Sequence, residues 1–133
     1  VENTVNHLVK KLSIKNLNYI LSYQSRVGPL KWIGPSTETI IKEEAKKQKI
    51  IIVVPVAFVS EHSETLVELD IEYKKLAVQN GSKDYIRVPA VTANQDFINS
   101  LKTSILSTGN EDLYTSSIRC LEKFTKCPRL QNL

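Results

Sequence analysis

The pattern of apolar and polar residues changes along this chain between helical spacing and short segments rich in β-forming residues. It predicts helices that alternate with strands. A helical spacing joins five apolar residues near the start: Val1, Val5, Leu8, Val9 and Leu12. This spacing predicts an amphipathic helix over about residues 2–12. Residues 18–24 are rich in β-forming side chains and predict a strand, and Ser36 offers the N-cap of a helix that runs to about residue 48.

The most hydrophobic segment predicts the centre of a parallel sheet. Residues 50–58 read IIIVVPVAF and are apolar throughout, as in a strand covered on both faces. Ser60 offers the cap of a long helix to about residue 79, residues 85–91 predict a further strand and residues 96–106 another helix. Strand and helix thus alternate three times, which is typical of parallel βαβ units in an α/β fold. Because three strands make a small sheet, we expect a neighbouring strand or a close partner from outside these residues.

Composition limits the chain to one ordinary domain. It has 133 residues, of which 41% are hydrophobic and 24% are charged, and this excludes a disordered tail or a membrane bundle. Eighteen Lys and Arg against fourteen Asp and Glu give a charge of +4, which is spread too thinly to indicate nucleic-acid binding. The chain divides into residues 1–107, which carry the α/β pattern, and residues 108–133, a basic extension that we expect to be partly helical.

The cellular context is bounded by what the sequence lacks. Two cysteines, Cys120 and Cys127, are too few for a disulfide scaffold, which favours a reducing compartment. No basic cluster followed by an apolar run indicates a signal peptide, and the longest apolar run is about half of what a membrane span needs. The chain contains no Met and starts within a predicted helix. An excised initiator and a piece of a longer protein both fit this start.

Several enzyme classes lack their signature motifs here. The sequence contains no GxGxxG, P-loop, HExxH, GxSxG or CxxC motif. Dinucleotide binding, phosphate binding by a P-loop, zincin proteolysis, serine hydrolysis and thioredoxin chemistry are therefore not indicated.

An acidic cluster follows the central strand, at the sheet edge where α/β proteins bind ligands. Its members are Glu61, His62, Glu64, Glu68 and Glu72. On an α-helix the last three fall within an arc of about 80°, with apolar stripes on both sides. One interpretation is a solvated acidic face. The other is a ladder facing a crevice, where carboxylate and imidazole groups bind Fe(II), Mn or Zn, or act as bases.

A second unusual segment follows the first predicted strand. Trp32, the only tryptophan, lies between two Gly-Pro pairs, and Ser25 and Arg26 precede it. The indole is either a plug that anchors the loop or a flat wall for a flat ligand. In the second case Ser25 and Arg26 suit carboxylate groups on that ligand.

These two segments together resemble a known family. YQSRVGPLKWIGPST and IIIVVPVAFVSEHSETLVELDIEY are similar to signatures of ferrochelatases, which insert Fe(II) into protoporphyrin IX to form heme, and the similarity extends from the first helix to about residue 106. The resemblance implies a Rossmann-like three-layer half-domain of the chelatase type, corresponding to the C-terminal half of the enzyme. It also implies a partly π-helical segment at the acidic ladder.

Residue roles follow from the same resemblance. Glu64 corresponds to an active-site glutamate, as metal ligand or proton acceptor, with His62 and Glu61 close by. Glu68 and Glu72 correspond to the acidic ladder that leads from it, and Glu64, Glu68 and Glu72 are the expected metal-binding residues. Trp32 corresponds to an aromatic residue of the porphyrin pocket, where we also expect Ser25 and Arg26.

The sequence departs from the family in one respect. The family's catalytic histidine lies in an N-terminal segment, and neither His7 nor His62 occupies that place. The resemblance therefore implies that this chain needs the missing N-terminal half for efficient metal insertion. A porphyrin-binding or metal-binding half-domain without turnover, and a short chelatase acting as a homodimer, are the alternatives.

The resemblance also bears on cofactors and location. We expect no required cofactor, with Fe(II) as the substrate metal, because Cys120 and Cys127 make only half of the ligand set of a [2Fe-2S] cluster. The expected partners are protoporphyrin IX, ferrous iron and the missing half, without nucleic acid. The expected location is the cytoplasm, with peripheral contact at the inner membrane surface.

Overall fold

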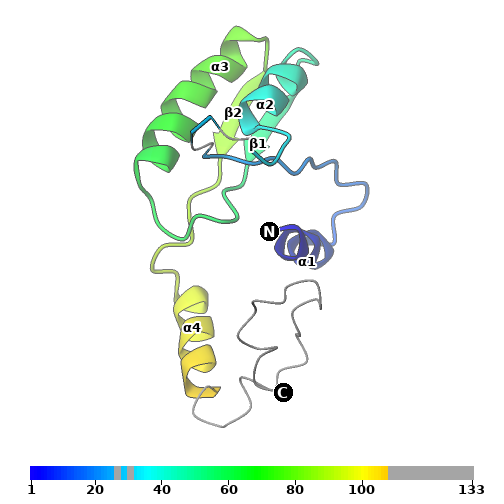
Figure 1. Cartoon of the computed structure of the whole chain (residues 1–133). Coiled ribbons are helices and arrows are strands. Elements are labelled where there is room, and N and C mark those ends of the chain that lie inside the picture. Colours follow the sequence, from blue (N-terminus) through cyan, green and yellow to red (C-terminus); the bar gives the residue numbers. More distant parts are fainter. Residues whose placement is uncertain (26–27, 30–31, 108–133) are drawn as a thin grey trace. The chain divides into compact units, whose positions relative to one another are not determined.

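The computed structural model describes residues 1–25, 28–29 and 32–107 (Figure 1). Contacts divide the chain into two units, residues 1–92 and 93–133. The first unit is an α/β structure with a small parallel sheet flanked by helices, as the sequence pattern predicts.

The first helix has the predicted bounds. Helix α1 spans Glu2–Leu12, with Glu2 in its first turn and Lys10 and Lys11 in its last turn, where each charge complements the helix dipole. None of its residues is buried, and the helix ends at Ser13 in a left-handed conformation. Its apolar stripe is only partly covered, because Val5 and Val9 are half-buried whereas Leu8 and Leu12 are exposed.

The predicted strand over residues 18–24 is wrong. Only Tyr23 pairs, in an isolated parallel bridge with Ser36, through hydrogen bonds from Tyr23 N to Pro35 O (2.9 Å) and from Thr37 N to Tyr23 O (3.1 Å). Helix α2 begins at Thr37, directly after this bridge. Because a helical backbone turns its hydrogen bonds inward, the ladder cannot continue beyond one residue.

Helix α2 starts where the sequence predicts and ends earlier. It spans Thr37–Ala45, and Ser36 caps it by accepting a hydrogen bond from Thr39 N (3.2 Å). The chain then makes a turn in which Lys47 and Lys49 pair with Glu44 at 2.5 and 3.0 Å. These lysines belong to the helix end rather than to a binding site.

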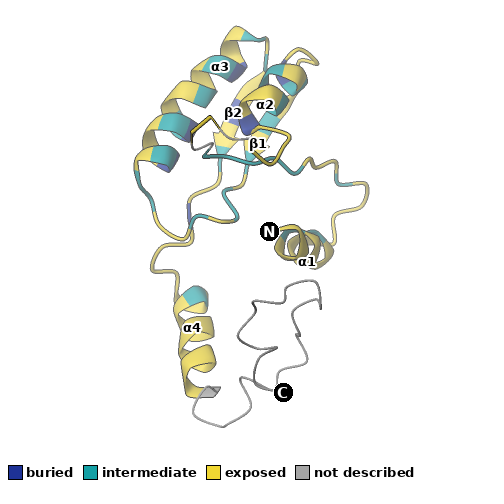
Figure 2. Ribbon diagram, in the orientation of Figure 1, coloured by how far each residue is buried: buried dark blue, intermediate teal, exposed yellow. Residues whose placement is uncertain are grey.

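Among the residues that the structure describes, the sheet has two strands instead of three. Strand β1 spans Ile50–Val53 and pairs in parallel with β2, which spans Asp84–Arg87. Helices α2 and α3, the latter spanning Tyr73–Gln79, pack on one face of the sheet, where apolar side chains form a core. Figure 2 marks the buried positions of these elements in dark blue. The core comprises Ile41, Ala77 and Tyr85, with Ile51, Val53, Tyr73 and Leu76 packed around them.

The other face of the sheet is exposed within the first unit. Its apolar residues are Ile50, Ile52, Val54, Ile86 and Val88. The prediction of a central strand covered on both faces is therefore wrong for residues 1–92, because the helix before β1 and the helix after it pack on the same side. The continuous apolar pattern correctly indicates that both faces are suited to burial.

The long helix predicted from Ser60 is replaced by two helices of different kinds. A π-helix, η1, spans Glu64–Glu72 and leads directly into α3. The backbone N–H of Tyr73 donates to the carbonyl of Glu68, five residues back, which is the π-helical pattern. The π-helical segment implied by the family resemblance is thus confirmed, and the start of the helix is corrected from Ser60 to Glu64.

The second unit contains one described helix. Helix α4 spans Gln95–Ser107, and the Asn94 side chain accepts hydrogen bonds from Asp96 N (2.9 Å) and Phe97 N (3.3 Å). In the part of the chain that the structure describes, no helix has both the length and the apolar character needed to cross a membrane. The extension predicted for residues 108–133, with Cys120 and Cys127, lies outside the described residues.

We expect Ile41→Ala to lower the free energy of unfolding by about 2–5 kcal/mol, because Ile41 is 2% exposed and its removal leaves a cavity between α2 and the sheet. Ile50→Ala, on the uncovered sheet face, serves as control and should change it by less than about 0.5 kcal/mol. Urea denaturation of both variants measures the difference. Equal losses would contradict the one-sided core.

Candidate functional site

The acidic ladder lies on the π-helix, and this changes its geometry. A π-helix has more than four residues per turn, so residues four apart fall short of a full turn instead of passing beyond it. Glu64, Glu68 and Glu72 still follow one side of η1, but the arc calculated for an α-helix does not apply. Glu64 and Glu68 are half-buried whereas Glu72 is exposed. The ladder therefore runs from the solvent at Glu72 to a partly enclosed carboxylate at Glu64.

Glu64 contacts the segment that precedes the loop containing Trp32. We call this loop, residues 28–35 with its two Gly-Pro pairs, the tryptophan loop. The hydroxyl of Ser25 donates a hydrogen bond to Oε2 of Glu64, although the two residues are 39 positions apart. Ser25 has φ of 62°, a left-handed conformation that costs a residue other than glycine of order 1–3 kcal/mol. This conformation is maintained at the point where the chain meets Glu64.

A second set of hydrogen bonds links the same segment to Glu68. The indole N–H of Trp32 donates to Gln24 O (3.2 Å), and Gln24 Nε2 donates to the Tyr73 hydroxyl (3.2 Å). That hydroxyl donates to Oε1 of Glu68 (3.3 Å), and burial raises the pKa of Tyr73, so the phenol stays protonated as a donor. The structure thus brings together the two segments that the sequence singles out, the tryptophan loop and the ladder.

Trp32 is 41% exposed, and its contact with Gln24 is made through the indole N–H. The plug interpretation of this residue, which requires a buried ring, is therefore not supported. Arg26 lies outside the described residues, so its predicted role stays a prediction.

His62 is half-buried at the turn before η1. Its ring contacts Phe58 edge-on at 4.7 Å between centroids, and Nδ1 accepts a hydrogen bond from Glu64 N (3.2 Å). A neutral imidazole that accepts at Nδ1 carries its proton on Nε2. In this arrangement His62 therefore presents an N–H donor at Nε2.

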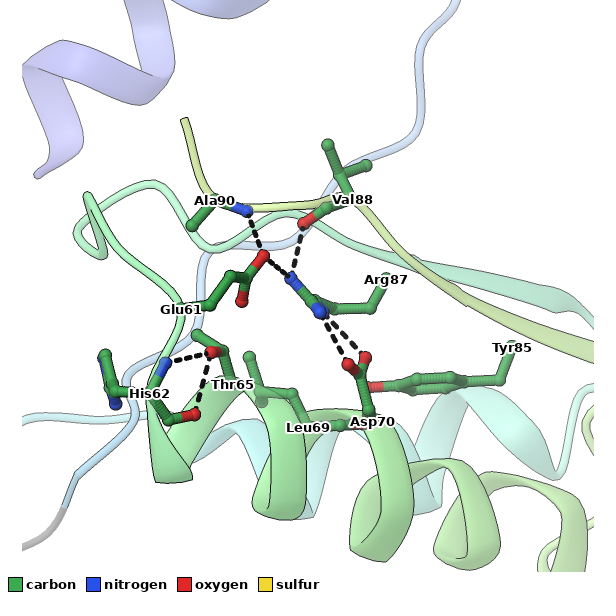
Figure 3. A network of polar contacts seen from close by, with 9 residues as sticks. All are labelled: Glu61, His62, Thr65, Leu69, Asp70, Tyr85, Arg87, Val88 and Ala90. Carbon is green, nitrogen blue, oxygen red and sulfur yellow. Dashed lines mark hydrogen bonds and ion pairs between the residues drawn. The ribbon is translucent and has the colours of Figure 1, made fainter. Parts of the chain in front are cut away.

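The buried hydroxyl of Thr65 fixes the backbone of the same turn. It accepts from His62 N (2.9 Å) and donates to His62 O (3.0 Å), so His62 has a defined place relative to the start of η1. Figure 3 shows these contacts beside a larger polar network.

The centre of that network is Arg87, a residue that the sequence analysis missed. Its guanidinium donates to Asp70 from Nε (2.7 Å) and Nη2 (2.5 Å) and to Glu61 from Nη1 (2.7 Å) (Figure 3). Glu61 also accepts from Ala90 N (2.9 Å). The available signal was the placement of an arginine at the end of a strand next to an acidic helix, since buried arginine requires carboxylate partners.

These contacts give Glu61 and Asp70 a structural role. Hydrogen bonds from Arg87, together with the one from Ala90 N, lower the pKa of Glu61 from 4.5 to about 2. The hydrogen bonds from Arg87 also lower the pKa of Asp70 below its ordinary value. Both carboxylates are ionised and paired at neutral pH, which leaves Glu64, Glu68 and Glu72 as the acids of this segment that do not pair with Arg87.

No group of three or more His, Cys, Asp or Glu side chains in residues 1–25, 28–29 and 32–107 is arranged to hold a metal ion. A shallow depression lined by Val1, Glu2, Asn3 and Tyr23 lies elsewhere, near the start of α1.

Comparison with known proteins gives a consistent result. The model of the family described as ferrochelatase matches residues 1–108. The ferrochelatase of Pelagibacter ubique is 58% identical over 134 residues, covering 98% of this chain and 39% of that protein. The ferrochelatase of Rickettsia prowazekii is 49% identical over 133 residues, covering 96% of this chain and 39% of that protein. This chain thus spans about 39% of the length of these curated relatives.

We expect Glu61→Gln to reduce the pH dependence of stability in acid. Because the pKa of Glu61 is about 2 in the folded protein and about 4.5 in the unfolded chain, the unfolded state binds more protons between these values. The stabilising effect of the Glu61 charge is therefore complete above pH 4.5 and is lost as the pH falls through 2.

The difference in unfolding free energy between the unmodified protein and Glu61→Gln should narrow from about pH 5 to about pH 2, as measured by denaturant titrations at each pH. Ser63→Ala, an exposed and uncharged change in the same turn, is the control and should give a constant difference. A constant difference for Glu61→Gln would contradict the assigned pairing.

Proposed function

The chain belongs to the ferrochelatase family, and from this we propose that it forms the C-terminal half of the active site of an enzyme that inserts Fe(II) into protoporphyrin IX to make heme. The observation that carries the proposal is the hydrogen bond between Ser25 and Glu64. It places the innermost acid of the ladder against the segment that leads into the tryptophan loop.

The reaction requires proton removal. Each Fe²⁺ that enters the macrocycle replaces two pyrrole N–H protons, which leave to a base. We assign this acceptor role, or that of last metal ligand, to Glu64, because its carboxylate is half-buried and is not paired with Arg87. His62 acts beside it, and the tautomer indicated by its Nδ1 contact favours donation of a hydrogen bond from Nε2.

Metal delivery is assigned to the outer part of the ladder. Glu72 is exposed and Glu68 is half-buried, so a cation meets carboxylates of decreasing exposure on its way to Glu64. Oxygen ligands that contact the ion one at a time bind a divalent cation weakly, which suits a substrate metal that must be released. We propose Fe(II) as this substrate and no required cofactor. The suggestion that Cys120 and Cys127 hold no cluster stays a prediction, since both lie outside the described residues.

Porphyrin binding is assigned to the tryptophan loop. The exposed indole of Trp32 offers a flat apolar surface for the macrocycle. Ser25 and Arg26 are proposed to bind the porphyrin carboxylates. In the structure the Ser25 hydroxyl donates to Glu64, so binding of a carboxylate at Ser25 would have to break or share that hydrogen bond.

The proposed partner is the part of the enzyme that the relatives have and this chain does not span. Its contribution includes the catalytic histidine expected from the family resemblance. The uncovered face of the sheet supports such a partner, because Ile50, Ile52 and Ile86 are exposed there although strand residues of this kind are normally buried.

We also propose that residues 1–107 form the half-domain and residues 108–133 a separate basic extension. We propose a cytoplasmic location with peripheral contact at the inner membrane surface. Poor solubility of porphyrin and heme favours this location.

We expect Glu64→Gln to abolish most metal insertion. The assay uses a chimera in which this chain replaces the matched 39% of the Pelagibacter ubique relative, and it follows zinc insertion into protoporphyrin by fluorescence. Loss of a positioned base or ligand should lower kcat by about a hundredfold or more. Glu43→Gln, exposed on α2, is the matched control and should leave kcat unchanged.

Three results would contradict the proposed function. A folded chimera without insertion would remove the assigned activity. Porphyrin binding without turnover under all conditions would favour a binding module. Turnover by this chain alone as a homodimer would show that the missing half is not required.

We expect Ile52→Ser to weaken association with the rest of the enzyme without unfolding this chain. Ile52 is 61% exposed on the uncovered sheet face, so its replacement should change the free energy of unfolding of the separate chain only slightly. If that face is an interface, the affinity for the remainder of the Pelagibacter ubique protein should fall about tenfold or more, measured by titration calorimetry. Gln79→Ser, exposed at the end of α3, is the control. Unchanged affinity would place the interface elsewhere.

A further inference from the structure

We propose that Arg87 is a positioning residue for metal insertion, which holds the segment from Glu61 to Asp70 in place so that Glu64 meets the Ser25 segment. The inference rests on the proposed function and adds a residue to which neither the sequence motifs nor the family comparison assigns a role. Arg87 touches none of the proposed ladder residues, so it acts through the backbone that carries them.

Arg87 is fixed to the sheet. It is the last residue of β2, its backbone pairs with Val53 of β1, and its side chain is only 8% exposed. A side chain enclosed to this degree samples few rotamers, so its guanidinium has a defined place relative to the strands. Through Arg87, the sheet therefore fixes the position of the segment from Glu61 to Asp70.

The guanidinium of Arg87 binds one residue before Glu64 in the sequence and one residue after it. One arm binds Glu61, three residues before it, and the other binds Asp70 through two hydrogen bonds, six residues after it (Figure 3). Ala90 N adds a second hydrogen bond to Glu61. Movement of Glu64 along or around the axis of η1 would therefore break contacts at one end or the other.

This support matters because η1 is an unusual helix. π-helical hydrogen bonding is normally confined to a single turn, but η1 extends over nine residues. Relaxation of η1 to an α-helix would tighten each turn and rotate the later residues relative to the earlier ones. The fork at Arg87 joins Glu61 to Asp70 across most of this length, so the two ends cannot rotate independently.

The chemistry of the contact requires arginine. A guanidinium presents donors in a rigid planar fork and can bind one carboxylate with two parallel bonds while it binds another with a third. Lysine has the charge but concentrates it at one flexible point. Without either cation, the carboxylates of Glu61 and Asp70 would face each other unneutralised, and their repulsion would displace the segment.

The test uses Arg87→Ala and Arg87→Lys in the chimera described above. For Arg87→Ala we expect kcat for zinc insertion to fall about ten- to a hundredfold, because small displacements of a reacting group have effects of this size. The KM for porphyrin should change less than about threefold, since Trp32 and Ser25 lie on a different segment. Arg87→Lys should give an intermediate kcat.

Hydrogen exchange gives a readout that does not depend on turnover. Amide exchange over Glu64–Glu72 should accelerate at least about tenfold in Arg87→Ala while exchange in α2 stays unchanged. Lys42→Ala, which removes an exposed ion pair with Glu38, is the control for loss of a cation. It should alter neither kcat nor the amide exchange rate over Glu64–Glu72. If Arg87→Ala does not fold, the neutral set Glu61→Gln, Asp70→Asn and Arg87→Met avoids unpaired buried charge and should show the same loss of kcat.

The outcomes separate this inference from the proposed function. Two results with an active chimera would overturn the positioning role and leave the proposed function in place. In the first, the folded Arg87→Ala variant keeps its kcat. In the second, its kcat falls and its KM for porphyrin changes by a similar factor. A folded, unmodified chimera without insertion would overturn the proposed function and the catalytic part of this inference together.

Discussion

The π-helix from Glu64 to Glu72 is the constraint on which the rest of the structure depends. Its hydrogen-bond geometry is poorer than that of an α-helix, so its persistence over nine residues requires contacts from outside. Those contacts come from separate segments: Ser25 at Glu64, Tyr85 at the Leu69 carbonyl (2.8 Å) and Arg87 at Asp70. The same contacts that stabilise the helix also determine where its acids lie. Stability and placement of the chemical groups are therefore one property of this fold.

The sequence predicted elements well where the governing interaction was local. Helix α1 and the Ser36 cap follow from spacing and from one side chain, and both are present. β propensity predicts a strand over residues 18–24, but a strand needs a partner, and the backbone that pairs with Tyr23 continues into α2 after a single bridge. The π-helix could not be derived from periodicity, because its cause is tertiary. It was expected only through the family resemblance.

The one-sided sheet explains both a correct and an incorrect prediction. The apolar run after residue 50 correctly indicates a strand with two apolar faces, but within residues 1–92 only one of these faces is covered. Ile51 and Val53 face the α2 and α3 layer, whereas Ile50 and Ile52 face away from it and are exposed. A hydrophobic pattern reports what a surface is suited to contact, not which chain provides the contact.

The acids between residues 61 and 72 show why residue type alone could not define the site. All five are carboxylates on a short segment, and a motif treats them alike. In the structure, one cation on strand β2 distinguishes two of them from the others. Arg87 pairs with Glu61 and Asp70, which holds both side chains in place and lowers the pKa of both. Glu64 and Glu68 instead accept hydrogen bonds from neutral hydroxyl groups, which position a carboxylate without neutralising its charge. The hydrogen-bond partners thus divide these acids into two that pair with Arg87 and two that contact hydroxyl groups.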